Sequence, residues 1–282
     1  MANMTVTTTA NFIPEIWSDE VVATYKSNLV AANLVRNINH AGKKGDSINI
    51  PVPGRNSANS KTADATVTYN TDTALTLQVV IDQHYEWSTQ IEDIAELQAL
   101  NSMRKFYTDD AGFALAKQVD SAIITNLDGA SALSALGGLP AGNAVISTVT
   151  DWDTTILTAI ENLNDNNVPV DGRSLIVTPS CMTALMKEER FTEQQFIGDG
   201  SAIKTGKIGS IYGVDVFMST QVGTGNTEKA FLFQKDAIVL ATQQSVRSQT
   251  QYKQEYLADL FTSDCVYGTK TVRPGSIQEM TS

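Results

Sequence analysis

Residues 90–129, QIEDIAELQALNSMRKFYTDDAGFALAKQVDSAIITNLDG, contain the longest helical pattern of the chain. Apolar side chains recur every three or four residues and no proline interrupts them, so the pattern predicts a helix over residues 90–128 that ends at Gly129. At about 1.5 Å per residue, an unbroken helix here is on the order of 55 Å long. Its length favours an extended molecule over a sphere.

The segment before this helix has the pattern of paired strands. In SINIPVPG, Ile48, Ile50 and Val52 alternate with other residues, and the run TVTYNTDTALTLQVVIDQHYEWST is again rich in β-forming side chains. The stretch between them, RNSANSKTADA, has no large apolar residue. The sequence therefore predicts a long hairpin whose tip has no core of its own. Because a lone hairpin is marginal in water, we expect it to lie on a neighbour.

The remaining segments predict an α+β fold. A Thr-rich polar arm opens the chain, and a helix is expected after Pro14, with Ile16, Val21, Tyr25 and Leu29 among its apolar positions. Helices and strands alternate between residues 151 and 245, which predicts a compact α+β subdomain. The expected division is residues 1–45 (arm and first helix), 46–88 (hairpin), 89–150 (long helix), 151–245 (compact subdomain) and 246–282 (returning strands).

Composition limits the classes of protein to which this chain can belong. With 282 residues, 42% of them hydrophobic, it can bury a sizeable core. Cys181 and Cys265 are too few for a disulfide scaffold and lack metal-binding spacing, so we expect them to be packed inside in a reducing compartment. The formal net charge of −11 argues against tight binding to nucleic acid. No apolar run approaches the ~18–20 residues of a membrane span, and no secretory signal is expected.

One stretch comes close to a nucleotide-binding loop. GSAIKTGKI, residues 200–208, resembles the pattern G-x-x-x-x-G-K-[ST], in which backbone amides and the lysine bind phosphates. Five residues, not four, separate Gly200 from Gly206, and Ile208 stands where the metal-binding hydroxyl belongs. The preceding segment is polar rather than a buried strand. We therefore predict a surface loop and no cofactor.

The other residue types that carry catalysis or bind metals find no partner motif. His40 lies in a predicted turn and His84 at the end of a predicted strand, so a structural role is expected for both. Asp151 and Asp153 open a predicted helix, where capping and first-turn carboxylates are common. The sequence thus predicts no catalytic site, no metal site and no enzyme activity.

Four phrases in a fixed order resemble the major capsid proteins of tailed bacteriophages, which have the Hong Kong 97-type fold. The resemblance covers nearly the whole chain. The phrases resemble, in turn, the arm with the first strand of the extended loop, a strand–helix unit with proline before the helix, a glycine-rich approach to a strand, and the closing strand: FIPEIWSDEV with GDSINIPVPG, IVTPSCMTALMKEERF, KIGSIYGVDVFMSTQV and DCVYGTKTVRPGSI.

This resemblance implies an α+β Hong Kong 97-like capsid fold with an N-terminal arm, an extended hairpin loop, a peripheral domain containing the long spine helix, and a compact axial domain. It implies hexamers and pentamers that close into an icosahedral shell around double-stranded DNA, assembled in the cytoplasm of a bacterial host. The partners implied are other copies of the chain, a portal, a separate scaffolding protein and a decoration protein. An acidic subunit is expected to enclose DNA without binding it tightly.

The resemblance also implies where subunits touch. We expect assembly contacts in the arm, the hairpin and the loop of residues 200–208, namely Phe12, Trp17, Arg55, Lys61 and Lys204. Gly206, Gly209 and Gly213 are expected to serve tight turns and close backbone approach. Some relatives form Lys–Asn crosslinks, and Lys61 near the hairpin tip is the one lysine that we name for such a bond.

Three alternatives remain open at the level of sequence. An encapsulin-like shell would have the same fold and would enclose an enzyme rather than DNA. A soluble enzyme with an unrecognised site is a second alternative, and a tail component of a virion is a third. Gene neighbourhood and the size of the purified particle distinguish them.

Overall fold

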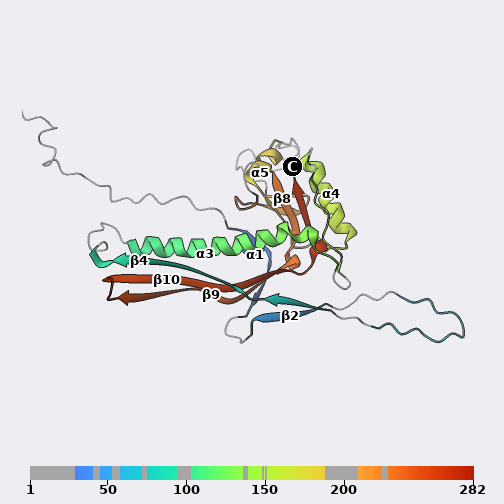
Figure 1. The fold of residues 1–282 in the computed structure, drawn as a ribbon. Coiled ribbons are helices and arrows are strands. Elements are labelled where there is room, and N and C mark those ends of the chain that lie inside the picture. The colour runs from blue at the N-terminus through green and yellow to red at the C-terminus, as the bar shows by residue number, and fades with distance from the viewer. Residues whose placement is uncertain are drawn as a thin grey trace, which may run out of the picture.

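The structure is a computed structural model that describes residues 29–40, 45–52, 58–71, 75–94, 103–135, 139–147, 149, 151–187, 209–223 and 228–282. It contains two larger sheets and a separate hairpin (Figure 1). A four-stranded sheet and the long helix extend to one side, and a compact unit with a five-stranded sheet lies at the other end. The described part of the chain is thus elongated, as the long helix predicts.

The four-stranded sheet has the order β1-β9-β10-β4, with bounds Arg36–Asn39, Ile238–Lys253, Ala258–Thr271 and Gln83–Glu92. Only the β1–β9 pair is parallel. The helix α3 (Met103–Asp128) runs along one face (Figure 1). Burial along β4 alternates in agreement with this position of α3. Tyr85 and Trp87 are partly covered, whereas His84 and Glu86 are exposed on the opposite face.

The hairpin of β2 (Ser47–Val52) and β3 (Leu75–Val80) pairs in antiparallel register. Its base packs on the four-stranded sheet, where Val79 and Ile81 join Val239, Ala241 and Val272 in one apolar cluster. Residues 58–71 continue beyond the ladder as exposed chain. The predicted hairpin without a core at its tip is therefore confirmed for β2, β3 and residues 58–71. The prediction also included residues 83–88, which instead belong to β4 of the four-stranded sheet, because they pair with β10.

The compact unit has a five-stranded sheet in the order β11-β8-β5-β7-β6. The helices α4 (Trp152–Asp165) and α5 (Pro179–Leu185) pack with it in one apolar cluster. The short 3-10 turns η2 (Ala130–Ala132), η3 (Lys235–Ala237) and η4 (Pro274–Ser276) join elements. The strand bounds are Ile277–Thr281 (β11), Lys229–Gln234 (β8), Arg173–Val177 (β5), Val214–Met218 (β7) and Ser210–Ile211 (β6).

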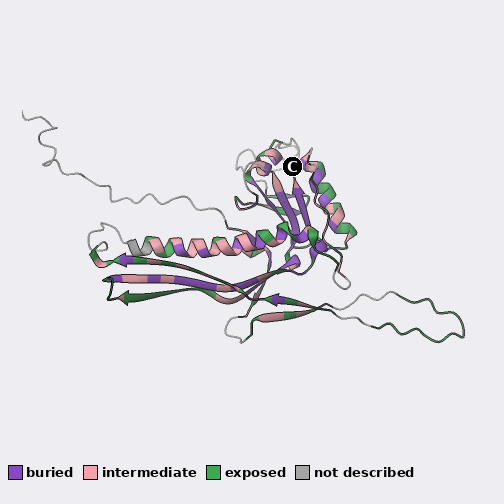
Figure 2. Cartoon of the chain, viewed as in Figure 1, coloured by how far each residue is buried: buried purple, intermediate pink, exposed green. Residues whose placement is uncertain are grey.

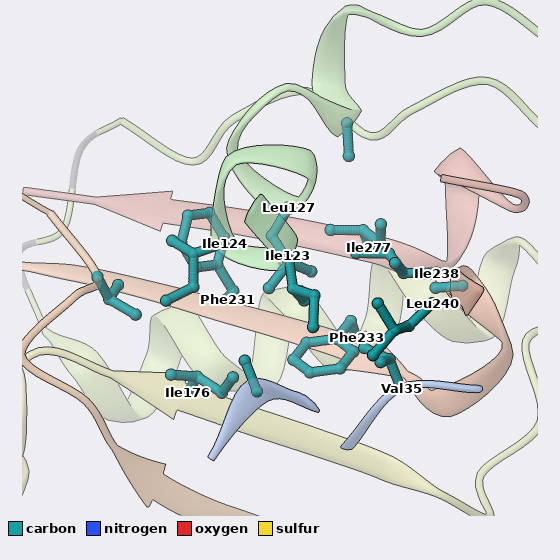
Figure 3. Packing of buried hydrophobic residues seen from close by; sticks show 14 of the residues in the cluster. Val35, Ile123, Ile124, Leu127, Ile176, Phe231, Phe233, Ile238, Leu240 and Ile277 are labelled. Carbon is teal, nitrogen blue, oxygen red and sulfur yellow. The ribbon is translucent and has the colours of Figure 1, made fainter. Parts of the chain in front are cut away.

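The two units share a core where the long helix meets the five-stranded sheet. Figure 3 shows Ile123, Ile124 and Leu127 of α3 packed against Phe231 and Phe233 of β8. The short helix α1 (Ala31–Leu34) joins the same cluster. All three α3 side chains are buried, so the compact end of α3 is fixed by a continuous apolar contact.

Two sequence predictions need correction. Residues 90–92, predicted as helix, belong to β4, because Ile91 pairs with Asp259 and sheet pairing overrides the helical periodicity. The run AIVLATQ is a strand, but β9 continues through residues 245 and 246 to Lys253, so the expected division there falls inside a strand. The division into five segments stays a prediction.

Candidate functional site

The tip of the β2–β3 hairpin holds apolar side chains away from every core cluster of the described chain. Tyr69 is 86% exposed and Val67 is 55% exposed. Between the two arms, Asn59 Nδ2 donates to Asn70 Oδ1 over 2.6 Å. Lys61 is exposed on the same tip. An arm that ends in exposed apolar side chains is suited to contact another molecule.

Gly268 of β10 seats the base of this hairpin. A Cβ on Gly268 would collide with the carbonyl oxygen of Val80 and come within 2.9 Å of Ile81 Cα. Only glycine allows the backbone of β3 to cross the sheet this closely. Nearby, Gln243 Nε2 donates to the Gly45 carbonyl over 3.1 Å. The hairpin is therefore attached at its base and unsupported by this subunit's core at its tip.

The far end of the four-stranded sheet forms a second exposed apolar surface, which we call the distal tip: Ile94, Phe106, Tyr256 and Leu257. Tyr256 and Leu257 are 61% and 64% exposed in the turn between β9 and β10. The Asp93 amide donates to the Leu257 carbonyl over 3.1 Å, which ties this turn to the end of β4. The hairpin and the distal tip thus place apolar side chains at two extremities of the subunit.

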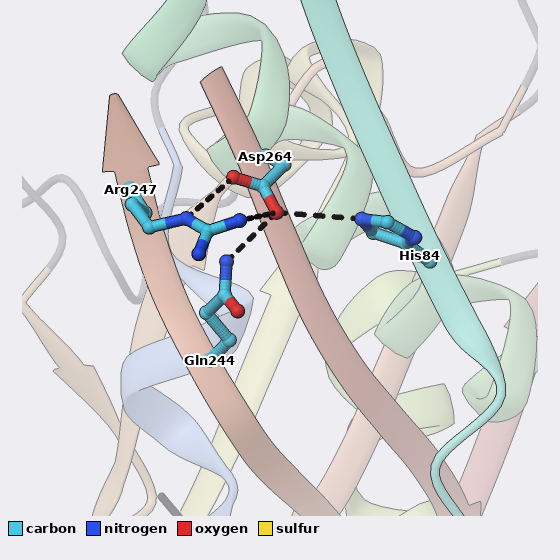
Figure 4. Close-up of polar contacts among 4 residues, drawn as sticks. All are labelled: His84, Gln244, Arg247 and Asp264. Carbon is cyan, nitrogen blue, oxygen red and sulfur yellow. Dashed lines mark hydrogen bonds and ion pairs between the residues drawn. The ribbon is translucent and has the colours of Figure 1, made fainter. Parts of the chain in front are cut away.

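A polar cluster crosses the open face of the four-stranded sheet (Figure 4). Arg247 donates to both oxygens of Asp264 over 3.1 and 3.0 Å, and Gln244 Nε2 donates over 2.8 Å. His84 Nε2 lies 3.4 Å from the same carboxylate. Arg247, ahead of Gln244 and His84, holds the pKa of Asp264 below its ordinary value. Because both oxygens are already engaged, the cluster is a clasp across β4, β10 and β9.

The other candidate catalytic residues have structural surroundings. His40 lies next to β1, where its Nε2 is buried without a hydrogen-bond partner in the described part of the chain. Cys181 and Cys265 are buried, and burial raises the pKa of both thiols, which suppresses the nucleophilic thiolate. Asp151 accepts hydrogen bonds from the Asp153 and Thr154 amides, which confirms its role as the cap of α4. No group of three metal-binding side chains occurs among the described residues.

A partly buried ion cluster joins the long helix to the compact unit. Lys229 of β8 pairs with Asp128 at the end of α3, and its Nζ lies 2.8 Å from Glu279 of β11. Burial lowers the pKa of Lys229, but its bonds to Asp128 and Glu279 outweigh burial and the net shift is upward. Burial raises the pKa of Glu279 against the opposing effect of Lys229. The lysine therefore compensates a buried carboxylate at the junction of the two units.

The loop of residues 200–208, with Lys204, lies outside the described residues. Gly213 does serve a turn, with φ +80° beside Tyr212 at φ +50° in the two-residue turn between β6 and β7. Consecutive positive φ angles are typical of a type I′ hairpin turn. Gly209 has φ +64° directly before β6. The predicted tight turn is confirmed for Gly213. The predicted close backbone approach is wrong for Gly209 and Gly213, because an added Cβ would meet no atom within 4 Å at either position. Gly206 lies outside the described residues.

Of the predicted contact residues, only Lys61 is described. Phe12, Trp17, Arg55 and Lys204 lie outside the described residues, and their contacts stay predictions. Sequence reasoning missed Tyr69, the distal tip and the Lys229 cluster as features of interest. Alternating Val67 and Tyr69 in a segment without a core signalled the first, whereas the other two depend on long-range strand register.

No helix in the part of the chain that the structure describes is both long enough and apolar enough to cross a membrane.

Comparison with known proteins identifies relatives over nearly the whole chain. A family model described as "Phage capsid protein" matches residues 30–279. No curated protein sequence matches. Among solved structures, one from Mycobacterium phage Che8 is 25% identical with a TM-score of 0.82, and the match covers 96% of this chain and 97% of that chain.

Two further structures share the fold at lower identity. The capsid of cyanophage P-SCSP1u has 17% identity and a TM-score of 0.83, covering 96% of this chain and 93% of that chain. The capsid of a native GTA particle, computed with C5 symmetry, has 11% identity and a TM-score of 0.74, covering 100% and 99%. The Hong Kong 97-like fold expected from the sequence is therefore confirmed.

Proposed function

The chain belongs to the phage capsid protein family and is a major capsid protein of an icosahedral shell, and from that premise we propose that its copies form the hexamers and pentamers of a shell around the double-stranded DNA of a tailed phage. The family match covers residues 30–279. The C5 symmetry used for the GTA particle capsid supports the five-fold ring.

The observation that carries this proposal is the exposed hairpin tip. Tyr69 and Val67 extend beyond the β2–β3 ladder, where they contribute nothing to a core of the described chain. If a neighbouring copy covers these side chains, the removal of their apolar surface from water contributes favourable binding free energy. Because the tip and the surface that receives it differ, the contact is heterologous, and repeated heterologous contacts close into rings.

The acidic charge of the subunit supports a container rather than a DNA-binding protein. A net charge of −11 disfavours tight contacts with phosphates, so packaged DNA is enclosed and remains releasable. We propose the virion capsid as the place of the mature protein and the cytoplasm of a bacterial host as the place of assembly. A portal, a separate scaffolding protein and a decoration protein are the further partners.

The proposal keeps the five chain segments as functional parts and assigns no enzyme activity. Phe12 and Trp17 in the arm, Arg55 and Lys61 in the hairpin, and Lys204 are the proposed contact residues. If Lys61 forms a crosslink between copies, boiled shells give ladders on a denaturing gel and Lys61→Arg shells give monomer. A single monomer band from the original shells would rule out the crosslink at Lys61 and would not affect the proposal of a shell.

Electron microscopy of the protein, expressed with and without its neighbouring genes, tests the shell. Closed shells, or rings of five and six subunits, are expected. The variant Tyr69→Asp is expected to fold as the original subunit and to stop at unassembled protein, because a charge replaces the apolar contact. Ser60→Asp, at an exposed position on the opposite arm of the tip, serves as the control for charge. A monomer in every condition, from folded original protein, contradicts the proposal.

The family match also bears on the alternatives. The family is one of phage capsids, which favours a DNA-filled shell over an encapsulin-like compartment with an enzyme inside. Nucleic acid extracted from purified particles distinguishes the two directly: DNA is expected, and an enzyme cargo in its place contradicts the phage assignment.

A further inference from the structure

The turn between β9 and β10 combines two features that do not help its own subunit to fold. Leu257 has φ +45°, a left-handed conformation that bulky side chains avoid and that glycine accepts without strain. Its side chain is 64% exposed, next to Tyr256 at 61%. The Asp93 amide holds the turn in this form through its bond to the Leu257 carbonyl. A strained residue whose apolar side chain stays in water is typical of a binding surface.

The described charges around these two side chains are mainly acidic. Glu255 is exposed in the same turn, and exposed Glu92 of β4 lies opposite Ala258 in the strand pairing. One cation, Lys253, lies with its Nζ 6.0 Å from the centre of the Tyr256 ring. The turn therefore presents an apolar centre with carboxylates on its rim.

A hollow of complementary character lies at the base of the hairpin, and we call it the hairpin-base hollow. It has a volume of about 280 Å³ and lies between β3, the end of α3 and the segment from β10 to η4. Lys270 lines it and Arg273 lies between two lining residues; both are exposed, and neither forms an ion pair with a carboxylate of the described chain. The apolar lining comes from Leu77, Leu133, Val272 and Pro274.

We propose that the β9–β10 turn of one copy packs into the hairpin-base hollow of a second copy, with Leu257 inside the hollow and Glu255 beside Lys270 and Arg273. An apolar centre with an acidic rim then meets an apolar hollow with a basic rim. Removal of the apolar side chains from water stabilises the contact, and the opposite charges select this orientation over others.

The turn cannot reach the hollow of its own chain. Asn126 of α3 lines the hollow, whereas Phe106 of α3 belongs to the distal tip. Twenty positions of a helix span about 30 Å, which separates the two surfaces within one subunit. Figure 1 likewise shows the β9–β10 turn and the hairpin at opposite ends of the elongated part. The contact therefore joins two copies.

This inference rests on the proposed assembly of the chain into a shell and names a contact in addition to the hairpin tip. Every copy carries one turn and one hollow, and the two surfaces differ. The contact is thus heterologous and can repeat from copy to copy.

The variant Leu257→Gly separates folding from assembly. Because glycine accepts φ +45°, the unassembled subunit is expected to melt at the same temperature as the original or higher. The protein concentration at which shells form, measured by sedimentation and electron microscopy, is expected to rise at least tenfold. Val170→Ala, which trims an exposed apolar side chain on the compact unit, is the control and should change neither value. Shells from Leu257→Gly at the original concentration overturn this inference and leave the shell proposal intact, whereas an original protein that never assembles contradicts the shell proposal itself.

A charge exchange tests the orientation without changing Leu257. Lys270→Glu and Glu255→Lys are each expected to raise the assembly concentration, and the variant with both changes is expected to restore it, because the pair forms again with reversed signs. Lys117→Glu/Glu255→Lys has the same net charge, with the new carboxylate at an exposed position of α3, and should not restore assembly. Single variants that assemble normally, or a double variant that stays impaired, overturn the proposal.

A disulfide test decides which copies touch. The variant Tyr256→Cys/Ser134→Cys places one thiol on the turn and one at the lining of the hollow, and Cys181 and Cys265 are buried. In oxidised shells mixed from isotopically light and heavy chains, bonds are expected to join light to heavy chains. Tyr256→Cys/Thr158→Cys, with the second thiol exposed on α4, is the control and should form none. The absence of bonds in the first variant, or bonds only within single chains, overturns the proposal.

Discussion

The two larger sheets of this subunit differ in what covers them, as Figure 2 shows. In the five-stranded sheet, every residue of β5 and five of the six residues of β8 are buried. In the four-stranded sheet, residues 245–252 of β9 are exposed, and alternate residues of β4 are exposed along its length. The five-stranded sheet is covered by side chains of its own chain, whereas the four-stranded sheet leaves part of its surface exposed for additional contacts. Stability and assembly should therefore depend on different residues.

The largest effect is expected from the core of the five-stranded sheet. Phe233 is fully buried between β5 and β11, so Phe233→Ala removes a large apolar contact and leaves a cavity. We expect a loss of about 3–5 kcal/mol in the free energy of unfolding. Urea denaturation of the unassembled subunit measures it. Val170→Ala, at a side chain that is 66% exposed, is the control and should change stability by less than about 0.5 kcal/mol. Equal losses would contradict the burial of Phe233 as the source of the effect.

The ion cluster at the junction should give the next largest effect. Lys229→Met leaves Glu279, with only 8% of its side chain exposed, without its cation. We expect a loss of about 2–3 kcal/mol at pH 7. The pKa of Glu279 is raised in the folded protein, so its ionisation opposes folding and the deficit should shrink as acid protonates it. Denaturation at pH 4 and pH 7 measures the change, with exposed Lys235→Met as the control. A deficit that grows in acid would refute this account.

Local patterns in the sequence predicted many of the elements correctly, because each depends on neighbours along the chain. The alternation of Ile48, Ile50 and Val52 predicted β2, and Asp151 predicted the start of α4. The end of β4 could not be predicted in this way, because the local pattern of residues 90–92 is helical and only their pairing with the distant strand β10 makes them part of β4. The Arg247–Asp264 clasp also depends on register between distant strands. Of the predicted contact residues, Lys61 lies within the described residues, where it is exposed on the hairpin tip.

Substitution of Gly268, on which the base of the hairpin packs, should give an intermediate loss of stability. Gly268→Ala forces a Cβ into the backbone of Val80 and Ile81, which must move. We expect a loss of about 1–3 kcal/mol and a hairpin released from the sheet. Faster hydrogen exchange of the β3 amides reports this release, because a hairpin that no longer packs on the sheet is marginally stable. Gly112→Ala in α3 meets no atom within 4 Å and should be neutral or stabilising by up to about 1 kcal/mol. Unchanged exchange of the β3 amides in Gly268→Ala would show that the hairpin is held elsewhere.

The smallest effect is expected from the clasp on the open sheet face, where Arg247 and His84 are more than half exposed and water weakens their attraction to Asp264. Asp264→Asn should cost about 1 kcal/mol at pH 7. Because the folded pKa of Asp264 is depressed, its stabilisation is complete above the ordinary value of 3.8 and is lost as pH falls through the folded pKa. The stability difference between the original protein and Asp264→Asn should therefore be constant from pH 5 to pH 7 and shrink below pH 4. A difference that persists in acid would mean that Asp264→Asn loses stability through poorer packing rather than through the lost charge. Stability on the open face would then depend on packing, as it does in the buried five-stranded sheet.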